Sequence, residues 1–135
     1  MPLKYLLDTN IVYDLVRQPQ GLIAKRIRAV GEGSICTNII VASELRYGAV
    51  KSGSKRLLDQ VDLILSAMEI LSLEEHVDHH YADIRQQLTQ KGTPIGPNDL
   101  LIAAHAMERN LTVVTANDRE FSRVPGLSVE NWLDI

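Results

Sequence analysis

Short apolar segments alternate with longer amphipathic ones along this chain, and that alternation limits the fold more than any other feature of the sequence. Strands are expected over residues 4–7, 34–37, 70–73 and 112–115, with a weaker fifth strand around Val129. The intervening segments repeat their apolar residues with helical periodicity. Because parallel strands need crossover connections of this kind, we predict an α/β fold in which helices cover both faces of a central parallel sheet.

Polar residues mark where several of the helices begin and end. Helices are expected over residues 10–17, 21–30, 39–49, 55–65, 74–91 and 100–109. Asn38, Ser54 and Asn98 stand where a side-chain oxygen can cap the first turn of a helix. Asn110 is placed to end a helix in the left-handed conformation. Residues 94–97, between the last two helices, are predicted to form a loop.

Length and composition fit one globular domain over residues 1–135. Hydrophobic residues make up 45% of the chain, which excludes a disordered protein. No apolar run approaches the ~20 residues of a membrane-spanning helix. The single cysteine, Cys36, cannot form an internal disulfide, and the N-terminus lacks the layout of a signal peptide, so a cytoplasmic location is expected. The formal net charge of −3 excludes a globally basic nucleic-acid-binding surface but not a local one.

Four acidic residues lie close to the expected carboxyl ends of strands, where parallel α/β sheets form their binding sites. Asp8 follows the first strand directly, and Asp118 comes shortly after Thr115, where the fourth strand ends. Asp99 lies in the first turn of an apolar helix, and Glu44 lies in the helix that follows the second strand. We expect the four carboxylates to converge at one edge of the sheet.

Clustered carboxylates without matching cations repel one another, and a divalent cation relieves that repulsion. Ligand sets made only of oxygen favour hard ions such as Mg²⁺ or Mn²⁺, and Mg²⁺ usually keeps several bound waters. Such a site suits metal-assisted hydrolysis of a phosphodiester bond. The side chains of Thr9, Thr115 and Asn117 flank the acids and are expected to orient carboxylates or bound waters.

Each acid also has an ordinary structural explanation when it is taken alone. Asp8 and Asp99 are favourable near the N-termini of the helices that follow them. Glu44 has Arg46 as a neighbour on a solvated helix, and Asp118 is suited to a turn. Spacing alone therefore leaves both a shared metal site and a set of separate structural roles open.

Four short segments resemble the sequence motifs of PIN-domain nucleases. They are Leu7-Asp8-Thr9-Asn10, Ser43-Glu44-Leu45-Arg46-Tyr47-Gly48, Asn98-Asp99-Leu100-Leu101-Ile102-Ala103-Ala104-His105-Ala106 and Thr115-Ala116-Asn117-Asp118-Arg119-Glu120-Phe121. They occur in the order typical of the family, and residues 124–132 also resemble the family's C-terminal segment. The motifs and the size of the chain are similar to those of the VapC-type toxins of bacterial toxin–antitoxin pairs.

This resemblance implies a magnesium- or manganese-dependent endoribonuclease with a three-layer α/β/α fold. It implies that Asp8, Glu44, Asp99 and Asp118 form the catalytic and metal-binding site, with Thr115 as a supporting hydroxyl. It also implies a homodimer and a small VapB-type antitoxin that blocks the site. The target of several such toxins is a structured RNA, often a transfer RNA.

Two other functions fit a small α/β protein with acidic residues. A receiver-like signalling domain needs adjacent acids after the first strand and a lysine after a late one, whereas this chain has only Asp8 and no lysine after Val114. A non-catalytic binding module of PIN type is the second alternative, and the presence of every motif acid counts against it.

Other chemically versatile residues are assigned ordinary roles. His76 and His80 have a spacing that can bind zinc, but no third ligand accompanies them, so they are expected with His79 on a solvated helix face. His105 is expected to pack or to make one hydrogen bond, and Cys36 to pack as a small apolar residue. The local basic residues either contact RNA phosphates or form solvated helix faces; they are Lys25, Arg26, Arg28, Lys51, Lys55 and Arg56.

Overall fold

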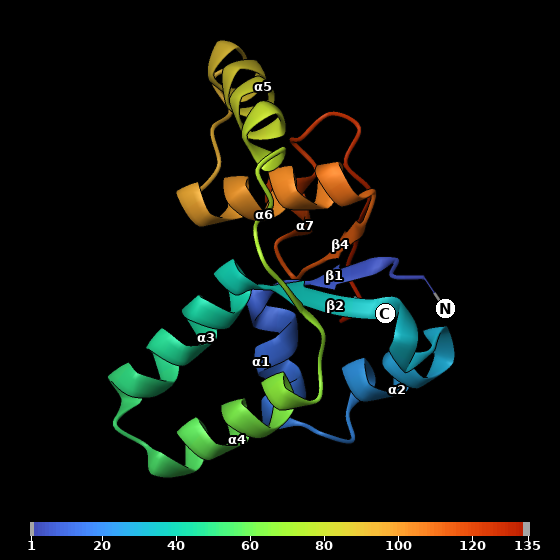
Figure 1. The fold of residues 1–135 in the computed structure, drawn as a ribbon, viewed down its shortest axis with the longest axis vertical. Coiled ribbons are helices and arrows are strands. Elements are labelled where there is room, and N and C mark those ends of the chain that lie inside the picture. Colours follow the sequence, from blue (N-terminus) through green and yellow to red (C-terminus); the bar gives the residue numbers. More distant parts are fainter. Residues whose placement is uncertain (1, 134–135) are drawn as a thin grey trace.

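The computed structural model describes residues 2–133 and contains a five-stranded sheet (Figure 1). The strands are β1 (Tyr5–Leu7), β2 (Ile35–Asn38), β3 (Ile70–Leu71), β4 (Thr112–Val114) and β5 (Val129–Glu130). Their order across the sheet is β3-β2-β1-β4-β5, and every neighbouring pair is parallel. The predicted α/β fold with a central parallel sheet is confirmed, including the weak fifth strand at Val129.

The strand order reverses at β1. From β1 the chain crosses to β2 and β3 on one side, and it later returns to β4 and β5 on the other. In open α/β sheets, ligands bind beyond the carboxyl ends of the strands at such a switch point. This order also differs from the 2-1-3-4-5 order of receiver domains, so the receiver-like alternative is excluded.

Helices cover both faces of the sheet. They are α1 (Thr9–Arg17), α2 (Leu22–Val30), α3 (Ile39–Ser52), α4 (Lys55–Ser66), α5 (Val77–Gln90), α6 (Pro97–Arg109) and α7 (Asp118–Phe121), with a short 3-10 turn at Glu32–Ser34. Figure 1 shows α1 to α4 on one side of the sheet and α5 to α7 on the other. The sheet is therefore the middle of three layers, as the resemblance implied.

The central strand and the helix beside it form much of the core. Tyr5, Leu6 and Leu7 of β1 are all buried, which is typical of a parallel strand covered on both faces. On α6, the small side chains of Ala103 and Ala104 are fully buried, and they let this helix pack closely on its neighbours. Asp8 directly follows this strand and Asp99 lies on this helix, so both acids are attached to buried elements of the fold.

The expected helices are present, but several of their boundaries differ: the helix predicted from residue 74 begins at Val77, and the one predicted to end at residue 49 continues to Ser52. Asn38 and Ser54 cap α3 and α4, because their side chains accept the backbone N–H groups of Val41 and Leu57. Asn110 ends α6 in the left-handed conformation. Asn98 is not a cap, however, because α6 already begins at Pro97 with Gly96 before it. Proline at the first helical position is favourable since its missing N–H would have no helical partner there.

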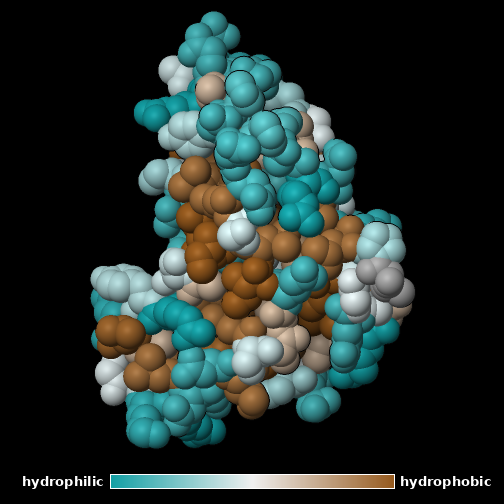
Figure 2. Space-filling model, in the orientation of Figure 1, coloured by the Kyte–Doolittle hydropathy of each residue, from teal (hydrophilic) through white to brown (hydrophobic). Residues whose placement is uncertain are grey.

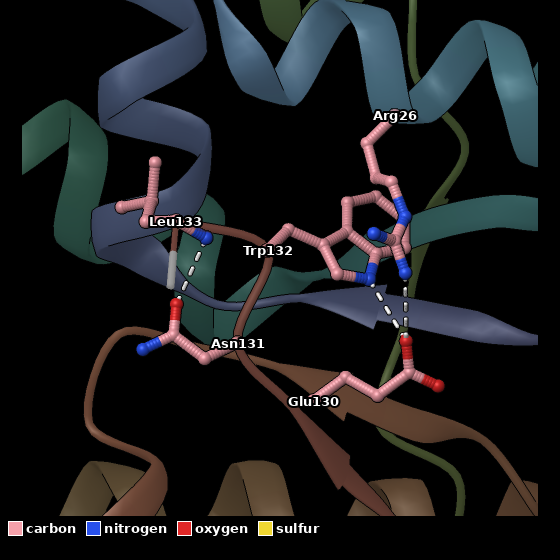
Figure 3. A network of polar contacts seen from close by, with 5 residues as sticks. All are labelled: Arg26, Glu130, Asn131, Trp132 and Leu133. Carbon is pink, nitrogen blue, oxygen red and sulfur yellow. Dashed lines mark hydrogen bonds and ion pairs between the residues drawn. The ribbon is translucent and has the colours of Figure 1, made fainter. Parts of the chain in front are cut away.

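The C-terminal segment is fastened to the sheet around Trp132 (Figure 3). The indole N–H of Trp132 donates to Oε1 of Glu130 at 2.9 Å, and the same oxygen lies 3.8 Å from Nη2 of Arg26 on α2. The Arg26 guanidinium lies 5.5 Å from the centroid of the Trp132 ring, which packs edge-on against Tyr5 of β1. Arg26 thus contributes to this contact as well as to the helix surface.

Within residues 2–133, no helix has both the length and the apolar character needed to cross a membrane.

Candidate active site

The residues that follow β1 and β4 lie side by side at the switch point of the sheet. The backbone N–H of Asp8 donates to the carbonyl oxygen of Val114 at 2.8 Å, which extends the β1–β4 pairing by one residue. The hydroxyl of Thr115 donates to Oδ2 of Asp8 at 2.8 Å, and both side chains are buried. The sheet therefore places a buried carboxylate where the topology predicts a ligand site.

Two backbone contacts hold the loop after β4 in place. The N–H of Asn117 donates to the hydroxyl oxygen of Thr115 at 2.9 Å, and the N–H of Ala116 donates to the side-chain oxygen of Asn10 at 3.1 Å. Since its oxygen accepts from Asn117, the Thr115 hydroxyl is oriented with its proton toward Asp8. Asn117, expected to act through its side chain, supports the site here through its backbone N–H.

Glu44 extends from α3 toward the same edge of the sheet. Its Oε1 accepts from the hydroxyl of Thr9 at 2.6 Å, and its Oε2 accepts from the side-chain amide of Asn98 at 3.4 Å. Thr9 begins α1 and Asn98 lies in the first turn of α6, so this carboxylate joins three helices. The amide expected to cap α6 contacts an acidic residue instead.

Asp99, in the first turn of α6, is surrounded by other acids. Its pKa is raised from 3.8 to about 7, first by burial and then by the negative charges of Asp8 and Glu120. A hydrogen bond with Glu120 and the charge of Glu44 raise the pKa further. Near neutral pH, this carboxyl group therefore holds a proton for much of the time in the absence of a cation.

The pKa of Asp8 is raised as well, mainly by burial. Hydrogen bonds from the backbone N–H of Thr9 and from the hydroxyl of Thr115 oppose the rise, whereas the charges of Glu44 and Glu120 add to it. The carboxylates are thus close enough to shift one another's pKa values. Acids with separate structural roles would not need to lie so close together.

Glu120 belongs to this acidic cluster, and sequence reasoning missed it. Its Oε1 accepts the backbone N–H of Gly96 at 2.8 Å, directly before α6. A Cβ atom on Gly96 would lie 3.7 Å from Oε1 of Glu120 and from Oδ2 of Asp99, so the two carboxylates flank this glycine. The available signal was the position of Glu120 in the fourth motif, on a short helix, α7, that was read as a turn.

Asp118 is the expected acid that the structure sets apart from the others. It begins α7, and its Oδ1 accepts from the side-chain amide of Asn131 at 3.2 Å. Its charge is not among those that raise the pKa of Asp8 or Asp99. Asp8, Glu44 and Asp99 come together as expected, while a ligand role for Asp118 stays a prediction.

The donor set of this cluster fits a hard divalent cation. Among residues 2–133, no lysine or arginine forms an ion pair with the clustered carboxylates of Asp8, Glu44, Asp99 and Glu120. In the same residues, no group of three acidic, histidine or cysteine side chains is already arranged to hold a metal ion. Mg²⁺ does not need such a cage, because it binds through one or two carboxylates and completes its coordination with water and phosphate oxygens. Burial raises the pKa values of Asp8 and Asp99, and repulsion between the acids adds to the rise; a cation would relieve that repulsion.

The predictions for histidine and cysteine also hold. His76 and His79 are largely exposed on or beside α5, and His80 lies 3.0 Å from a carboxylate oxygen of Glu108. Cys36 is buried in β2, and burial raises the pKa of its thiol to about 12. These residues contribute no competing site.

A three-layer α/β fold with carboxylates gathered at its switch point is the arrangement expected of a nuclease. The PIN domain family matches residues 5–127 of this chain. The chain is 41% identical to ribonuclease VapC2 of Rickettsia felis, over 95% of this chain and 97% of that protein. It is 40% identical to the tRNA(fMet)-specific endonuclease VapC of Salmonella typhimurium, over 96% of this chain and 98% of that protein.

Solved structures agree with these relatives. A chain in the crystal structure of VapBC2 from Rickettsia felis bound to a promoter DNA fragment superimposes with a TM-score of 0.90 at 37% identity, covering 96% of this chain and 99% of that chain. DNA-bound VapBC from Salmonella typhimurium gives a TM-score of 0.90 at 40% identity, covering 96% and 98%. The chain therefore belongs to the PIN-domain family, and within it to the VapC ribonuclease toxins of toxin–antitoxin pairs. The predicted family and its endoribonuclease activity are confirmed.

Proposed function

We propose that this endoribonuclease cleaves RNA with Mg²⁺ or Mn²⁺ held by Asp8, Glu44, Asp99 and Glu120. The observation that carries the proposal is that these acids lie together at the switch point of the sheet with no cationic side chain paired to them in residues 2–133. Burial, and then the charges of the neighbouring acids, raise the pKa of Asp99 to about 7. Asp118 is kept as a further catalytic and metal-binding candidate, because it begins the helix that carries Glu120.

The chain's own residues have distinct tasks in this mechanism. A bound cation would supply Lewis acidity and lower the pKa of a water molecule for attack on phosphorus. Thr115 holds one oxygen of Asp8, and Thr9 holds one oxygen of Glu44, so both carboxylates keep a fixed direction. Asp99 must lose its proton to solvent before its oxygen can act as a ligand.

Metal binding should stabilise the folded protein. Because a cation that binds only the native state adds free energy by mass action, roughly 2.7 kcal/mol at a hundredfold excess over Kd, we expect Mn²⁺ or Mg²⁺ to raise the melting temperature by several degrees at neutral pH. Glu44→Gln should diminish this response, whereas Glu75→Gln, at an exposed position beside α5, should retain it. A melting temperature that no divalent cation changes in the wild-type protein would contradict the metal site.

We propose that the substrate is a transfer RNA. A relative at 40% identity carries the name tRNA(fMet)-specific endonuclease, and the similarity covers almost the whole of both chains. Sequencing of RNA 5′ ends after brief induction in a bacterial host should show new ends concentrated in one or a few tRNAs. Ends spread across messenger RNA would contradict this assignment.

A groove beside the acids is suited to an antitoxin segment. A cavity of about 270 Å³ lies between α1, α3 and α4, with apolar residues along it and Thr9 and Glu44 at one end. We propose that a VapB-type antitoxin lies here and places a basic side chain, preferably arginine with its fork of donors, on Glu44. Solved VapBC complexes of similar chains support such a partner.

Gly48 offers a selective test of this partner site. It lines the groove, and a Cβ atom there would meet no atom within 4 Å. Co-expression of the cognate antitoxin should restore growth to cells that express the wild-type toxin, and the two proteins should co-purify. Gly48→Leu should fill the groove, so its growth arrest should persist despite the antitoxin. Equal rescue of both toxins would place the antitoxin elsewhere.

A homodimer in the cytoplasm completes the proposal. Large apolar side chains are exposed on α3 and α4, at Ile39, Tyr47, Val50 and Leu63. Figure 2 shows brown residues over parts of these helices and in a broad band toward α6. Exposed apolar surface of this kind often marks a protein–protein interface. Light scattering of the purified toxin should give twice the mass of one chain, and fractionation should recover the toxin with the cytoplasm.

A further inference from the structure

A buried polar pair joins the two helices that carry Glu44 and Asp99. His105 on α6 and Asn38, the N-cap of α3, are both fully buried. Nδ2 of Asn38 lies 3.0 Å from Nδ1 of His105. This buried contact links the start of α3, which carries Glu44, to α6, which carries Asp99.

The hydrogen bonds around Asn38 determine the state of the histidine ring. Oδ1 of Asn38 accepts the backbone N–H of Val41 at 3.0 Å, so the amide nitrogen faces His105 and donates to it. Nδ1 of His105 is therefore the acceptor, and the ring proton resides on Nε2. Burial and the nearby charge of Arg109 lower the pKa of His105, which keeps the ring neutral and its lone pair available.

This arrangement has an energetic cost that packing alone does not explain. Nε2 of His105 is buried without a hydrogen-bond partner among the described residues. An unsatisfied buried donor is unfavourable, and an apolar side chain of similar size would avoid that cost. The compensating effect of the histidine lies in its bond to Asn38.

The bond lies where it can fix the distance between two acids. Asn38 caps α3, the helix that carries Glu44, and His105 follows Asp99 on α6. The only other side-chain hydrogen bond between α3 and α6 among residues 2–133 is the long contact at the exposed end of the site, from Asn98 to Glu44 at 3.4 Å. The buried pair is thus the shorter of the two links.

We propose that His105 is a positioning residue that, through Asn38, holds the Glu44 and Asp99 carboxylates at the separation needed to bind a divalent cation. This role rests on the metal site proposed above. His105 itself touches neither the acids nor the substrate, and it acts by fixing α3 against α6.

The first test needs no metal. Long-range ¹H–¹⁵N spectra of the folded toxin should show the Nε2–H tautomer of His105, with Nδ1 unprotonated. Asn38→Ser should change the Nδ1 shift, because a serine hydroxyl can still cap α3 but cannot reach the ring as the amide does. The Nδ1–H tautomer in the wild-type protein would overturn the hydrogen-bond assignment and the proposed role.

The second test measures binding of Mn²⁺ alone by calorimetry. His105→Leu and Asn38→Ser should each weaken Mn²⁺ binding by roughly threefold or more, a magnitude usual for residues that couple elements at a distance. The double variant should be little weaker than either single variant, since both remove the same bond. His105→Gln, whose side-chain oxygen can accept from Asn38, should recover part of the affinity.

A matched control separates positioning from simple loss of stability. Ile102→Val removes a methyl group from a fully buried position on the same helix and should lower the melting temperature without changing Mn²⁺ affinity. Unchanged affinity in His105→Leu and Asn38→Ser, or an equal loss in Ile102→Val, would overturn the role of His105. A wild-type protein that binds no Mn²⁺ would instead overturn the metal site itself.

Discussion

Asp8→Asn and Asp99→Asn should each reduce RNA cleavage by more than roughly 100-fold. Changing a residue that only supports a metal ligand can already cost up to about 100-fold, and loss of a ligand itself should cost more. Both changes keep the shape of the side chain while removing the charge on which a divalent cation depends. Induction of either variant in a bacterial host should not arrest growth. The measurement is cleavage of total tRNA by purified protein, with folding checked by circular dichroism.

Variants of Glu120 and Asp118 test which of these two acids belongs to the site. The structure places Glu120 in the acidic cluster, whereas the sequence motifs indicated Asp118. Glu120 raises the pKa of Asp99 and flanks Gly96, whereas Asp118 accepts from Asn131 away from that cluster. Glu120→Gln should therefore reduce cleavage more than Asp118→Asn does. An exposed acid on α4, changed as Asp59→Asn, serves as the control that retains full activity. Wild-type cleavage by a folded Asp99→Asn protein would refute the carboxylate mechanism.

The sequence predicted those parts of the fold that local chemistry determines. The strands are short and mostly apolar, and the side-chain caps at Asn38 and Ser54 act over a few residues, so pattern alone located them. Asp8 was predicted correctly at the sheet edge because it must follow a buried strand. The third strand proved shorter than expected, since only Ile70 and Leu71 pair with β2.

The errors concern residues whose roles depend on distant contacts. Asn98 is a residue type that often caps helices, but α6 already begins at Pro97. The side-chain amide of Asn98 instead donates to Glu44 on another helix. Glu120 could not be distinguished from an exposed acid until α7 was seen to direct it to Gly96. The Asn38–His105 bond spans the interior between two helices, so no local pattern indicates it.

The metal-free toxin should become less stable as pH rises, and Asp99→Asn should largely remove this dependence. The pKa of Asp99 is 3.8 in an unfolded chain and about 7 in the folded protein, so the folded state binds more protons between these values. Its contribution is thus fully favourable below the lower value and is lost as pH increases through the higher one. The shift of about three pKa units corresponds to at most roughly 4 kcal/mol, which solvent screening at a half-exposed group reduces to about 1–2 kcal/mol.

Thermal melting in chelator-treated buffer at pH 5 and pH 8 measures this difference. At pH 8, Asp99→Asn should melt about 3–8 °C above the wild-type protein, and at pH 5, closer to the unfolded pKa of 3.8, the difference should be clearly smaller. Saturating Mn²⁺ should reverse the order, because the cation stabilises only the protein that retains the carboxylate. Asp59→Asn should follow the wild-type protein under every condition. If Asp99→Asn were less stable than the wild-type protein at pH 8 without metal, Asp99 would be stabilising the fold, and the repulsion inferred among these acids would be absent. In that case, repulsion between Asp99 and the neighbouring acids could not be the reason that the site binds a cation.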